Sequence, residues 1–273
     1  MLDSQVAYLW ITTILAIGVV VSAGEYWFVR HSFDHGSVYS WTIFREQYNV
    51  GESSLRVLYD FIGREQTVRA MILFRGFAGV LAIGASPQTV RFSVVWVVIA
   101  LTGLYMSWRK PFGDDGADQM TNIVSITVCL CAVVGNGGFL FNLGLIFIAA
   151  QALLSYVTAG VAKLWSSSWR SGEAIFRVFN TESYGMRSIG CFLENKRSLS
   201  AILCWSVITF ECAFLFAPFA PLTISISLLL VIACFHVSCA IIMGLNNFVW
   251  AFLSTFPALL YCFQFSSAVI WAK

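Results

Sequence analysis

The sequence predicts an all-α protein embedded in a membrane: a helix bundle with about eight transmembrane helices and two further helices on the membrane surface. Of its 273 residues, 59% are hydrophobic and 11% are charged, and the mean hydropathy is +0.79. Soluble domains carry roughly 25% charged residues, so this composition places the chain in a lipid bilayer. Apolar runs recur along the whole length and predict a single transmembrane domain over residues 1–273.

Eight apolar runs have about the 17 to 25 residues that a helix needs to cross a bilayer. They cover residues 6–26, 69–86, 91–108, 120–136, 138–162, 199–217, 221–243 and 247–270. The first run lacks the basic start of a secretory signal, so we expect it to be retained as a span. Connections 30–66 and 170–196 mix apolar and charged residues, which is typical of amphipathic helices on a membrane surface.

The basic residues are distributed unevenly between the two sides of this arrangement. Arg91 and Lys273 fall on one side, Arg75 lies within a span, and the other thirteen of the sixteen Lys and Arg residues fall on the opposite side. Because basic residues concentrate in cytoplasmic connections, we expect a multi-pass protein with both termini outside the cytoplasm. The net charge of +2 is too small to indicate a nucleic-acid partner.

The eight cysteines do not form a pattern that indicates metal binding or disulfides. Seven lie within apolar runs and only Cys191 lies in a polar connection. Buried cysteines of this kind usually pack as small apolar residues, and neither a C-x-x-C motif nor a Cys/His cluster with zinc spacing is present. We therefore expect no metal site.

Lys163 is the residue on which the functional interpretation depends. It stands in Ala-Gly-Val-Ala-Lys-Leu-Trp, at the end of the fifth predicted span. A lysine there is paired, snorkelled to the interface, or neutral, and a neutral amine in a dry pocket is a base. Tyr156 and Gly160 share its helical face. The simplest alternative is that Lys163 only snorkels and fixes the topology.

Three other ionisable residues lie well inside predicted spans. His236 is in the seventh span, where it either satisfies a hydrogen bond in the bundle or serves a function. Glu211 is the only carboxylate deep in a span, so it is either protonated or paired. Arg75 is the only arginine at a comparable place, and a Glu211–Arg75 pair is the structural expectation.

A polar stripe enters the fourth span from the preceding connection. Asp115, Asp118 and Asn122 share one helical face, and Gln119 lies beside them. Acidic residues also suit the positive N-terminal end of a helix. The stripe is therefore either a helix cap or part of a polar pocket.

Three segments carry short motifs in a fixed order, and a fourth short motif precedes them. Residues 156–164 read Tyr-Val-Thr-Ala-Gly-Val-Ala-Lys-Leu and are followed by Trp169 and Gly172. Residues 235–236 read Phe-His and are followed by Gly244, Asn247, Phe248 and Pro257. Residues 116–119 read Gly-Ala-Asp-Gln, and an R-x-x-x-G motif runs from Arg75 to Gly79.

Together these motifs resemble vitamin K-dependent γ-glutamyl carboxylases and their bacterial relatives, the HTTM proteins. The carboxylases carry A-G-V-K-K-L…W…G and F-H…G…F…P, and the HTTM proteins carry G-S-D-Q. The resemblance covers about residues 70–260, which leaves an N-terminal span and amphipathic segment over residues 1–69. In size the chain is similar to small bacterial HTTM proteins that mature secreted toxin peptides, which implies a bacterial plasma membrane.

The resemblance implies roles for particular residues. In the carboxylases, the second lysine of K-K deprotonates vitamin K hydroquinone; it falls on Lys163, and Ala162 replaces the first. The active-site histidine falls on His236. The resemblance thus implies that Lys163 is the proton acceptor, that His236 is a proton donor or oxyanion partner, and that Asp118 is a polar residue that orients the substrate. It also implies a quinone or hydroquinone as a candidate cofactor and a peptide partner.

The sequence leaves three functions open. The first is a membrane-embedded, carboxylase-like enzyme or maturation factor that acts on a peptide and uses Lys163 as proton acceptor. The second is a non-catalytic assembly or export factor that recognises a secreted peptide through its surface helices. The third is a proton-coupled transporter with a relay through Glu211, His236 and Lys163.

Overall fold

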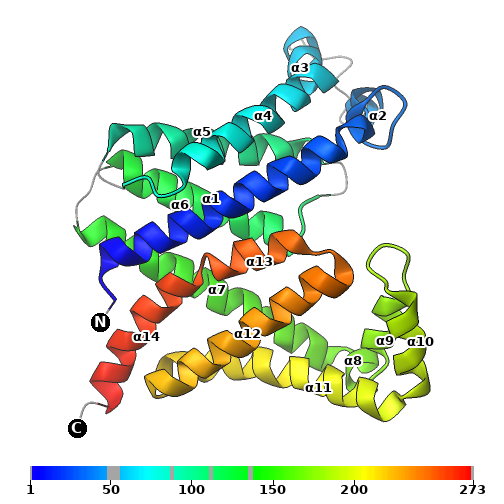
Figure 1. Ribbon diagram of the computed structural model, residues 1–273, viewed down its shortest axis with the longest axis vertical. Coiled ribbons are helices and arrows are strands. Elements are labelled where there is room, and N and C mark those ends of the chain that lie inside the picture. Colours follow the sequence, from blue (N-terminus) through cyan, green and yellow to red (C-terminus); the bar gives the residue numbers. More distant parts are fainter. Residues whose placement is uncertain (1, 48–55, 87–88, 111–112, 135–137, 272–273) are drawn as a thin grey trace. The chain divides into compact units, whose positions relative to one another are not determined.

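The computed structural model describes residues 2–47, 56–86, 89–110, 113–134 and 138–271, and these residues form helices and connections without a strand (Figure 1). The helices are α1 (Ser4–Phe28), η1 (Arg30–Phe33), α2 (Trp41–Gln47), α3 (Arg56–Gly63), α4 (Glu65–Ala82), α5 (Val90–Trp108), α6 (Gly116–Val134), α7 (Gly138–Trp165), α8 (Ser167–Arg170), α9 (Ala174–Phe179), α10 (Arg187–Asn195), α11 (Arg197–Ala213), η3 (Phe214–Phe219), α12 (Leu222–Met243), α13 (Asn246–Leu253) and α14 (Phe256–Trp271).

Seven helical segments of the described residues are long and apolar enough to cross a membrane, which confirms the predicted all-α, multi-pass membrane protein. They are Ser4–Phe28, Val90–Trp108, Gly116–Val134, Gly138–Trp165, Arg197–Phe219, Leu222–Met243 and Asn246–Trp271. The second predicted span, 69–86, is the remaining one and corresponds to α4. This helix has 18 residues and includes Glu65, Arg69 and Arg75, so it is not among the seven.

The two long connections contain the short helices that their amphipathic patterns predicted. Helices α2 and α3 lie in the first connection, of which residues 48–55 are outside the described part, and α9 and α10 lie in the second. In α10, Leu193 is buried and the neighbouring Phe192 is 53% exposed. Their placement on a membrane surface stays a prediction.

The contacts divide the chain into two compact units within the predicted transmembrane domain. Residues 8–144 form the N-terminal unit, and residues 145–273 together with residues 1–7 form the C-terminal unit. The first residues join the C-terminal unit through Leu2, whose amide donates to Gln264 Oε1 at 2.6 Å and whose carbonyl accepts from Gln264 Nε2 at 2.7 Å.

The N-terminal unit is built from α1, α4, α5 and α6, which run side by side (Figure 1). Helices in a bilayer associate through close packing, which small residues allow. Gly79 of α4 is an example, because a Cβ there would lie 2.8 Å from Val20 Cγ2 and 3.3 Å from the Ala16 carbonyl oxygen of α1. Trp96 and Ile99 are fully buried in the core of this unit.

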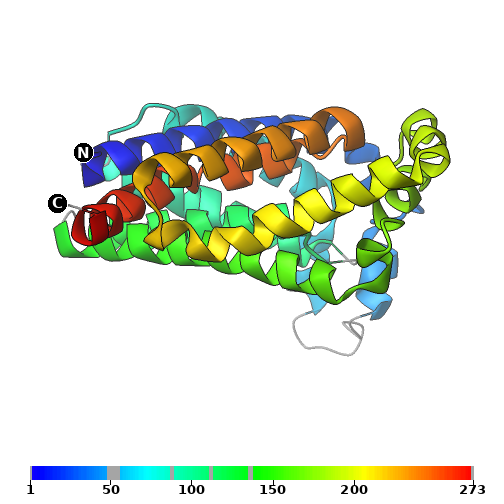
Figure 2. The same cartoon turned by 90° about the horizontal axis from the view of Figure 1, so that it is seen from below.

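The C-terminal unit contains α7 to α14, and its core includes the buried Phe214 and Phe263. The turn η3 joins α11 to α12, and Ser225 Oγ secures it by donating to the Ala217 carbonyl at 2.8 Å. From this turn α11 and α12 diverge along their length, as both views show (Figures 1 and 2). The wedge between them contains the candidate site.

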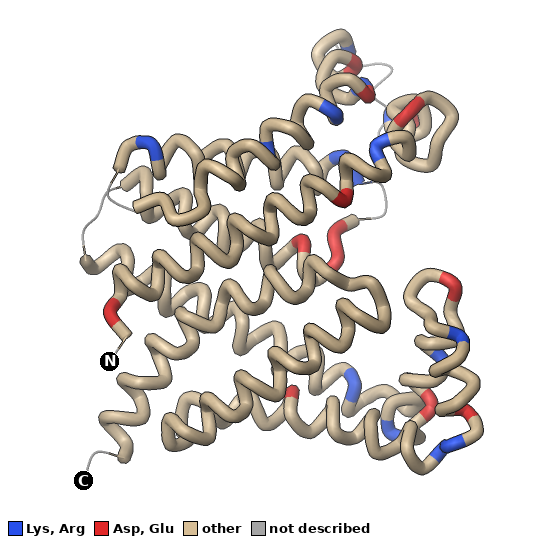
Figure 3. The backbone as a smooth tube through the Cα atoms, in the orientation of Figure 1, with Lys and Arg blue, Asp and Glu red and all other residues tan. Residues whose placement is uncertain are grey.

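Charged residues gather at particular places in each unit, as Figure 3 shows. In the N-terminal unit most of them lie around α2, α3 and the adjoining helix ends, and in the C-terminal unit most lie around α8, α9 and α10. The long helices between these places are largely free of charge. The few charged side chains within them are therefore the ones that need a specific partner.

Candidate functional site

Lys163 and Glu211 form a buried ion pair in the C-terminal unit. Lys163 is in the last turn of α7 and Glu211 is near the end of α11. The lysine Nζ lies 2.9 Å from Oε1 and 2.7 Å from Oε2 of the carboxylate. The side chains are 20% and 4% exposed, respectively. Of the three states that the sequence allows for Lys163, the structure thus shows the paired one.

The pair lies deep along α11. This helix begins at Arg197, and Glu211 comes 14 residues later, which corresponds to about 21 Å at 1.5 Å per residue. Gly160 explains how α7 reaches this depth, because a Cβ there would lie 2.9 Å from both Cys212 N and Glu211 Cβ. The close approach of the two backbones lets Lys163, one turn later on α7, reach the carboxylate.

The expected Glu211–Arg75 pair is corrected by this contact. Arg75 is 5% exposed on α4 of the N-terminal unit, and its Nη1 donates to the Ile99 carbonyl at 3.0 Å. Both oxygens of Glu211 are instead engaged by Lys163. The expectation failed because it matched the two residues by depth alone, whereas close helix packing at Gly160 selects the partner.

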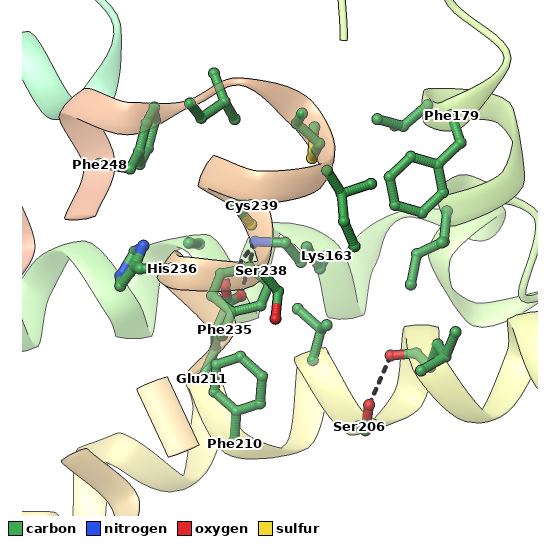
Figure 4. A pocket seen from close by; sticks show the side chains of 18 of the residues that line it. Lys163, Phe179, Ser206, Phe210, Glu211, Phe235, His236, Ser238, Cys239 and Phe248 are labelled. Atoms are coloured by element: carbon green, nitrogen blue, oxygen red, sulfur yellow. Dashed lines mark hydrogen bonds and ion pairs between the residues drawn. The ribbon is translucent and has the colours of Figure 1, made fainter. Parts of the chain in front are cut away.

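The ion pair faces a pocket of about 820 Å³ (Figure 4). This volume falls in the range of roughly 300–1,000 Å³ typical of ligand sites. Of the residues that the structure describes, Lys163 and Glu211 are the only charged ones that line it. Most of the wall is apolar, with aromatic rings from Trp169, Phe179, Phe192, Phe210, Phe235, Phe248 and Phe252. The Lys163 Nζ also lies 5.3 Å from the centroid of the Trp169 ring, in a cation–π contact.

His236 and Tyr156 form a second polar contact in the wall of the same pocket. The Tyr156 hydroxyl and His236 Nε2 are 2.9 Å apart, and each residue is 3% exposed. The imidazole stacks on Phe252 with centroids 4.7 Å apart and an interplanar angle of 13°. Among the described residues, His236 Nδ1 has no hydrogen-bond partner. Tyr156 therefore fixes the ring, and Nδ1 is buried without a partner among the described residues.

Four of the eight predicted site residues thus come together in the pocket: Lys163, Glu211, His236 and Tyr156. The other four belong to the N-terminal unit and do not line the pocket; they are Arg75, Asp118, Gln119 and Asn122.

The polar stripe on α6 has local partners. Asp118 accepts a hydrogen bond from Lys110 Nζ, Gln119 Nε2 donates to the Asp114 carbonyl at 3.2 Å, and Asn122 Nδ2 donates to a serine hydroxyl of α5 at 2.7 Å. Burial opposes protonation of Lys110, but nearby tyrosine and aspartate side chains outweigh it and raise the pKa of this lysine. The Asn122 contact joins α5 to α6, and the other two hold the connection before α6 to the first turn of this helix.

Several residues of the pocket were not singled out by the sequence. Trp169 appeared in the sequence only as part of the motif after residues 156–164, and Cys239 only as one of the cysteines in apolar runs, yet both line the pocket. The same holds for Ser206 and Ser238. Ser206, Ser238 and Cys239 each lie in an apolar run whose pattern does not separate a pocket wall from a lipid-facing surface, so no sequence signal marks these three residues.

Among the described residues, no group of three or more His, Cys, Asp and Glu side chains could hold a metal ion. No family model, no curated protein and no solved structure matches the chain. The geometry of the pocket is therefore the basis for the functional argument.

Proposed function

We propose that the protein is a membrane-embedded, carboxylase-like enzyme or maturation factor in which Lys163 accepts a proton from a substrate. One observation carries the proposal: the Lys163–Glu211 pair faces a large apolar pocket that no other charged residue of the described chain lines. The sequence resemblance adds a peptide as the partner on which the enzyme acts.

The pair has the chemistry that a proton acceptor needs. Two groups 2.7 Å apart can hold their shared proton as ammonium and carboxylate, or as amine and carboxylic acid. Apolar surroundings penalise the ionic form because both charges lose their hydration. Transfer of the proton to Glu211 therefore produces a neutral amine that can take a proton from a bound substrate.

His236, which lies on a different helix from Lys163, supports the same proposal. It lies 73 residues beyond Lys163 and lines the same pocket. Its ring is held by Tyr156, and its Nδ1 has no partner within the described chain. In the proposed enzyme His236 donates a proton or a hydrogen bond to the group that gains negative charge.

We also propose that the protein resides in a bacterial plasma membrane with both termini outside the cytoplasm. The asymmetric distribution of thirteen of the sixteen basic residues supports this orientation. Labelling of single cysteines introduced in the connection around Arg91 and in α9 with a membrane-impermeant reagent would test it. The first site should react in intact cells and the second only after lysis.

A proton-coupled transporter is the second candidate, because Lys163, Glu211 and His236 share one pocket and could relay a proton. The two proposals differ in what they require. A transporter needs pH-driven flux across liposomes and depends on Glu211, whereas an enzyme needs a chemical product and depends on the amine of Lys163.

The test compares cells that produce the wild type, Lys163→Arg and Lys163→Ala at equal membrane levels, with Lys196→Arg as the control for an exposed lysine. Mass spectrometry of the secreted and membrane peptides identifies a product that requires the wild-type protein. We expect both Lys163 variants to lose it, because an arginine side chain stays protonated and cannot act as a base. Unchanged product in Lys163→Ala would contradict the enzyme proposal.

A further inference from the structure

The pocket opens between α11 and α12. Leu203, Ser206 and Phe210 line it from α11, at a spacing that places them on one face of the helix. Phe235, Ser238 and Ile242 do the same from α12. Ser206 and Ser238 both line the pocket and are exposed, so the pocket is not sealed at these positions.

The two serines are compatible with a hydrocarbon environment. Ser206 Oγ donates to the Leu203 carbonyl and Ser238 Oγ donates to the Cys234 carbonyl, each at 2.8 Å within its own helix. A hydroxyl satisfied in this way does not need water. Neighbouring side chains such as Ile202 and Ile241, 65% and 74% exposed, are apolar. An opening bordered in this way is compatible with the hydrocarbon of a bilayer.

The charges in the pocket cancel. Lys163 and Glu211 contribute one positive and one negative charge, and they engage each other through both carboxylate oxygens. A ligand with a net charge would have to enter without a counter-ion or separate the pair, and either outcome leaves an unpaired charge in an apolar cavity. A ligand without a net charge avoids this penalty.

We infer that the pocket takes up, from the bilayer and through the opening between α11 and α12, a single-chain amphiphile with an uncharged hydroxyl head group. A hydroxyl both donates and accepts a hydrogen bond. It can accept from Lys163 and donate to Glu211 without disturbing the charge balance of the pair. His236 lines the same pocket, where its ring is held by the hydroxyl of Tyr156.

This inference concerns binding and stands apart from the proposed enzyme. It holds whether or not Lys163 accepts a proton, and it is tested by occupancy rather than by a product.

The test uses the purified full-length protein in liposomes with three photoreactive probes. The probes share one alkyl chain with a diazirine and carry a hydroxyl, a sulfonate or a trimethylammonium head, so that the two charged heads stay charged at any pH. Mass spectrometry of peptides from α11 and α12 measures labelling of the pocket wall. We expect the alcohol to label this wall at least about tenfold more than either charged probe. Equal labelling by the three probes would overturn the inference.

Variants of the pair sharpen the selectivity test. Glu211→Gln leaves the lysine charge uncompensated, so the sulfonate probe should become the preferred label. Lys163→Met leaves the carboxylate, so the trimethylammonium probe should become preferred. An unchanged order of the three probes in folded variants would contradict the charge argument, and the comparison in the wild type stands even if a variant fails to fold.

Entry from the bilayer has its own variant and a matched control. Ser238→Trp places a bulky ring at the opening, whereas Ser227→Trp places it on an exposed part of α12 that does not line the pocket. Both serines donate to the carbonyl four residues earlier, at 2.8 and 2.9 Å. Labelling by the alcohol should fall in Ser238→Trp and persist in Ser227→Trp. Equal labelling in the two variants would contradict entry between α11 and α12.

Discussion

The Lys163–Glu211 pair predicts a strong energetic coupling that a double-mutant cycle can measure. Removing one partner of a buried ion pair costs about 3–5 kcal/mol, because the other charge is left unpaired. Glu211 is 4% exposed and Lys163 is 20% exposed. Lys163→Met should therefore cost more than Glu211→Gln, since the carboxylate has less access to solvent. In the double variant no charge remains, and most of the lost stability should return.

Thermal unfolding of the purified protein in one detergent provides the assay. At about 2–4 °C per kcal/mol for a chain of this size, the single variants should lower Tm by roughly 6 to 20 °C. The exposed pair Glu173–Arg177 is the control, with N and O 2.6 Å apart but side chains 33% and 63% exposed. Its coupling should be at most about 0.5 kcal/mol. A coupling this small for Lys163–Glu211 would refute the account of a buried pair.

Three further outcomes follow from particular contacts. Gly160→Ala places a Cβ 2.9 Å from backbone of α11, so it should cost about 1–3 kcal/mol in thermal unfolding, whereas Gly24→Ala, with no atom within 4 Å of its Cβ, should be neutral or stabilising; equal shifts would contradict the close packing. Tyr156→Phe leaves the imidazole Nε2 without its partner and should cost about 1–3 kcal/mol in the same assay, which a Tm equal to that of the wild type would contradict. The indole of Trp41 and nearby arginines lower the pKa of Asp60 in the folded protein. The ionised carboxylate therefore stabilises the fold above the usual aspartate pKa of about 3.9, and this stabilisation is lost as the pH falls through the lower pKa of the folded state. Tryptophan fluorescence should therefore change below about pH 4 in the wild type and not in Asp60→Asn, and identical titrations would rule out this contact as the cause.

The membrane fold could be predicted from composition and periodicity, because both follow from the solvent. A bilayer requires long apolar helices whose backbone groups are hydrogen-bonded within the helix, and each apolar run of the sequence has the length and composition of such a helix. The structure confirms seven such helices in the described residues. The remaining run forms α4, in which Glu65, Arg69 and Arg75 interrupt the apolar pattern.

The partner of Glu211 could not be predicted in the same way. The sequence shows that Lys163, Arg75 and Glu211 each need compensation in an apolar region, but not which helices touch. That choice depends on backbone distance at Gly160, where the absence of a side chain brings α7 against α11. Helix packing in three dimensions therefore decides a pairing that hydropathy leaves open.

The walls of the pocket were beyond prediction for a related reason. The chain has 24 phenylalanines, and those of the pocket occupy runs that look like any other span. Phe210 lines the pocket, whereas Phe216, six residues later, is 66% exposed. Both are equally favourable in a bilayer, so neither position carries a distinguishing residue type. By contrast, His236 and Lys163 could be identified because polar groups in spans are costly and therefore rare.

The most direct test of the central claim, that Lys163 is held by Glu211 inside an apolar pocket, is an NMR comparison of the lysine side chains in the wild type and in Glu211→Gln. The chain has only four lysines, at positions 110, 163, 196 and 273. Reductive ¹³C-methylation of the full-length protein therefore gives four lysine signals beside that of the terminal amine, and single Lys→Arg variants assign these four. We predict that the Lys163 signal shifts in Glu211→Gln, whereas the signal of the exposed Lys196 stays where it is in the wild type. A Lys163 signal that is the same in the wild type and in Glu211→Gln would contradict the claim.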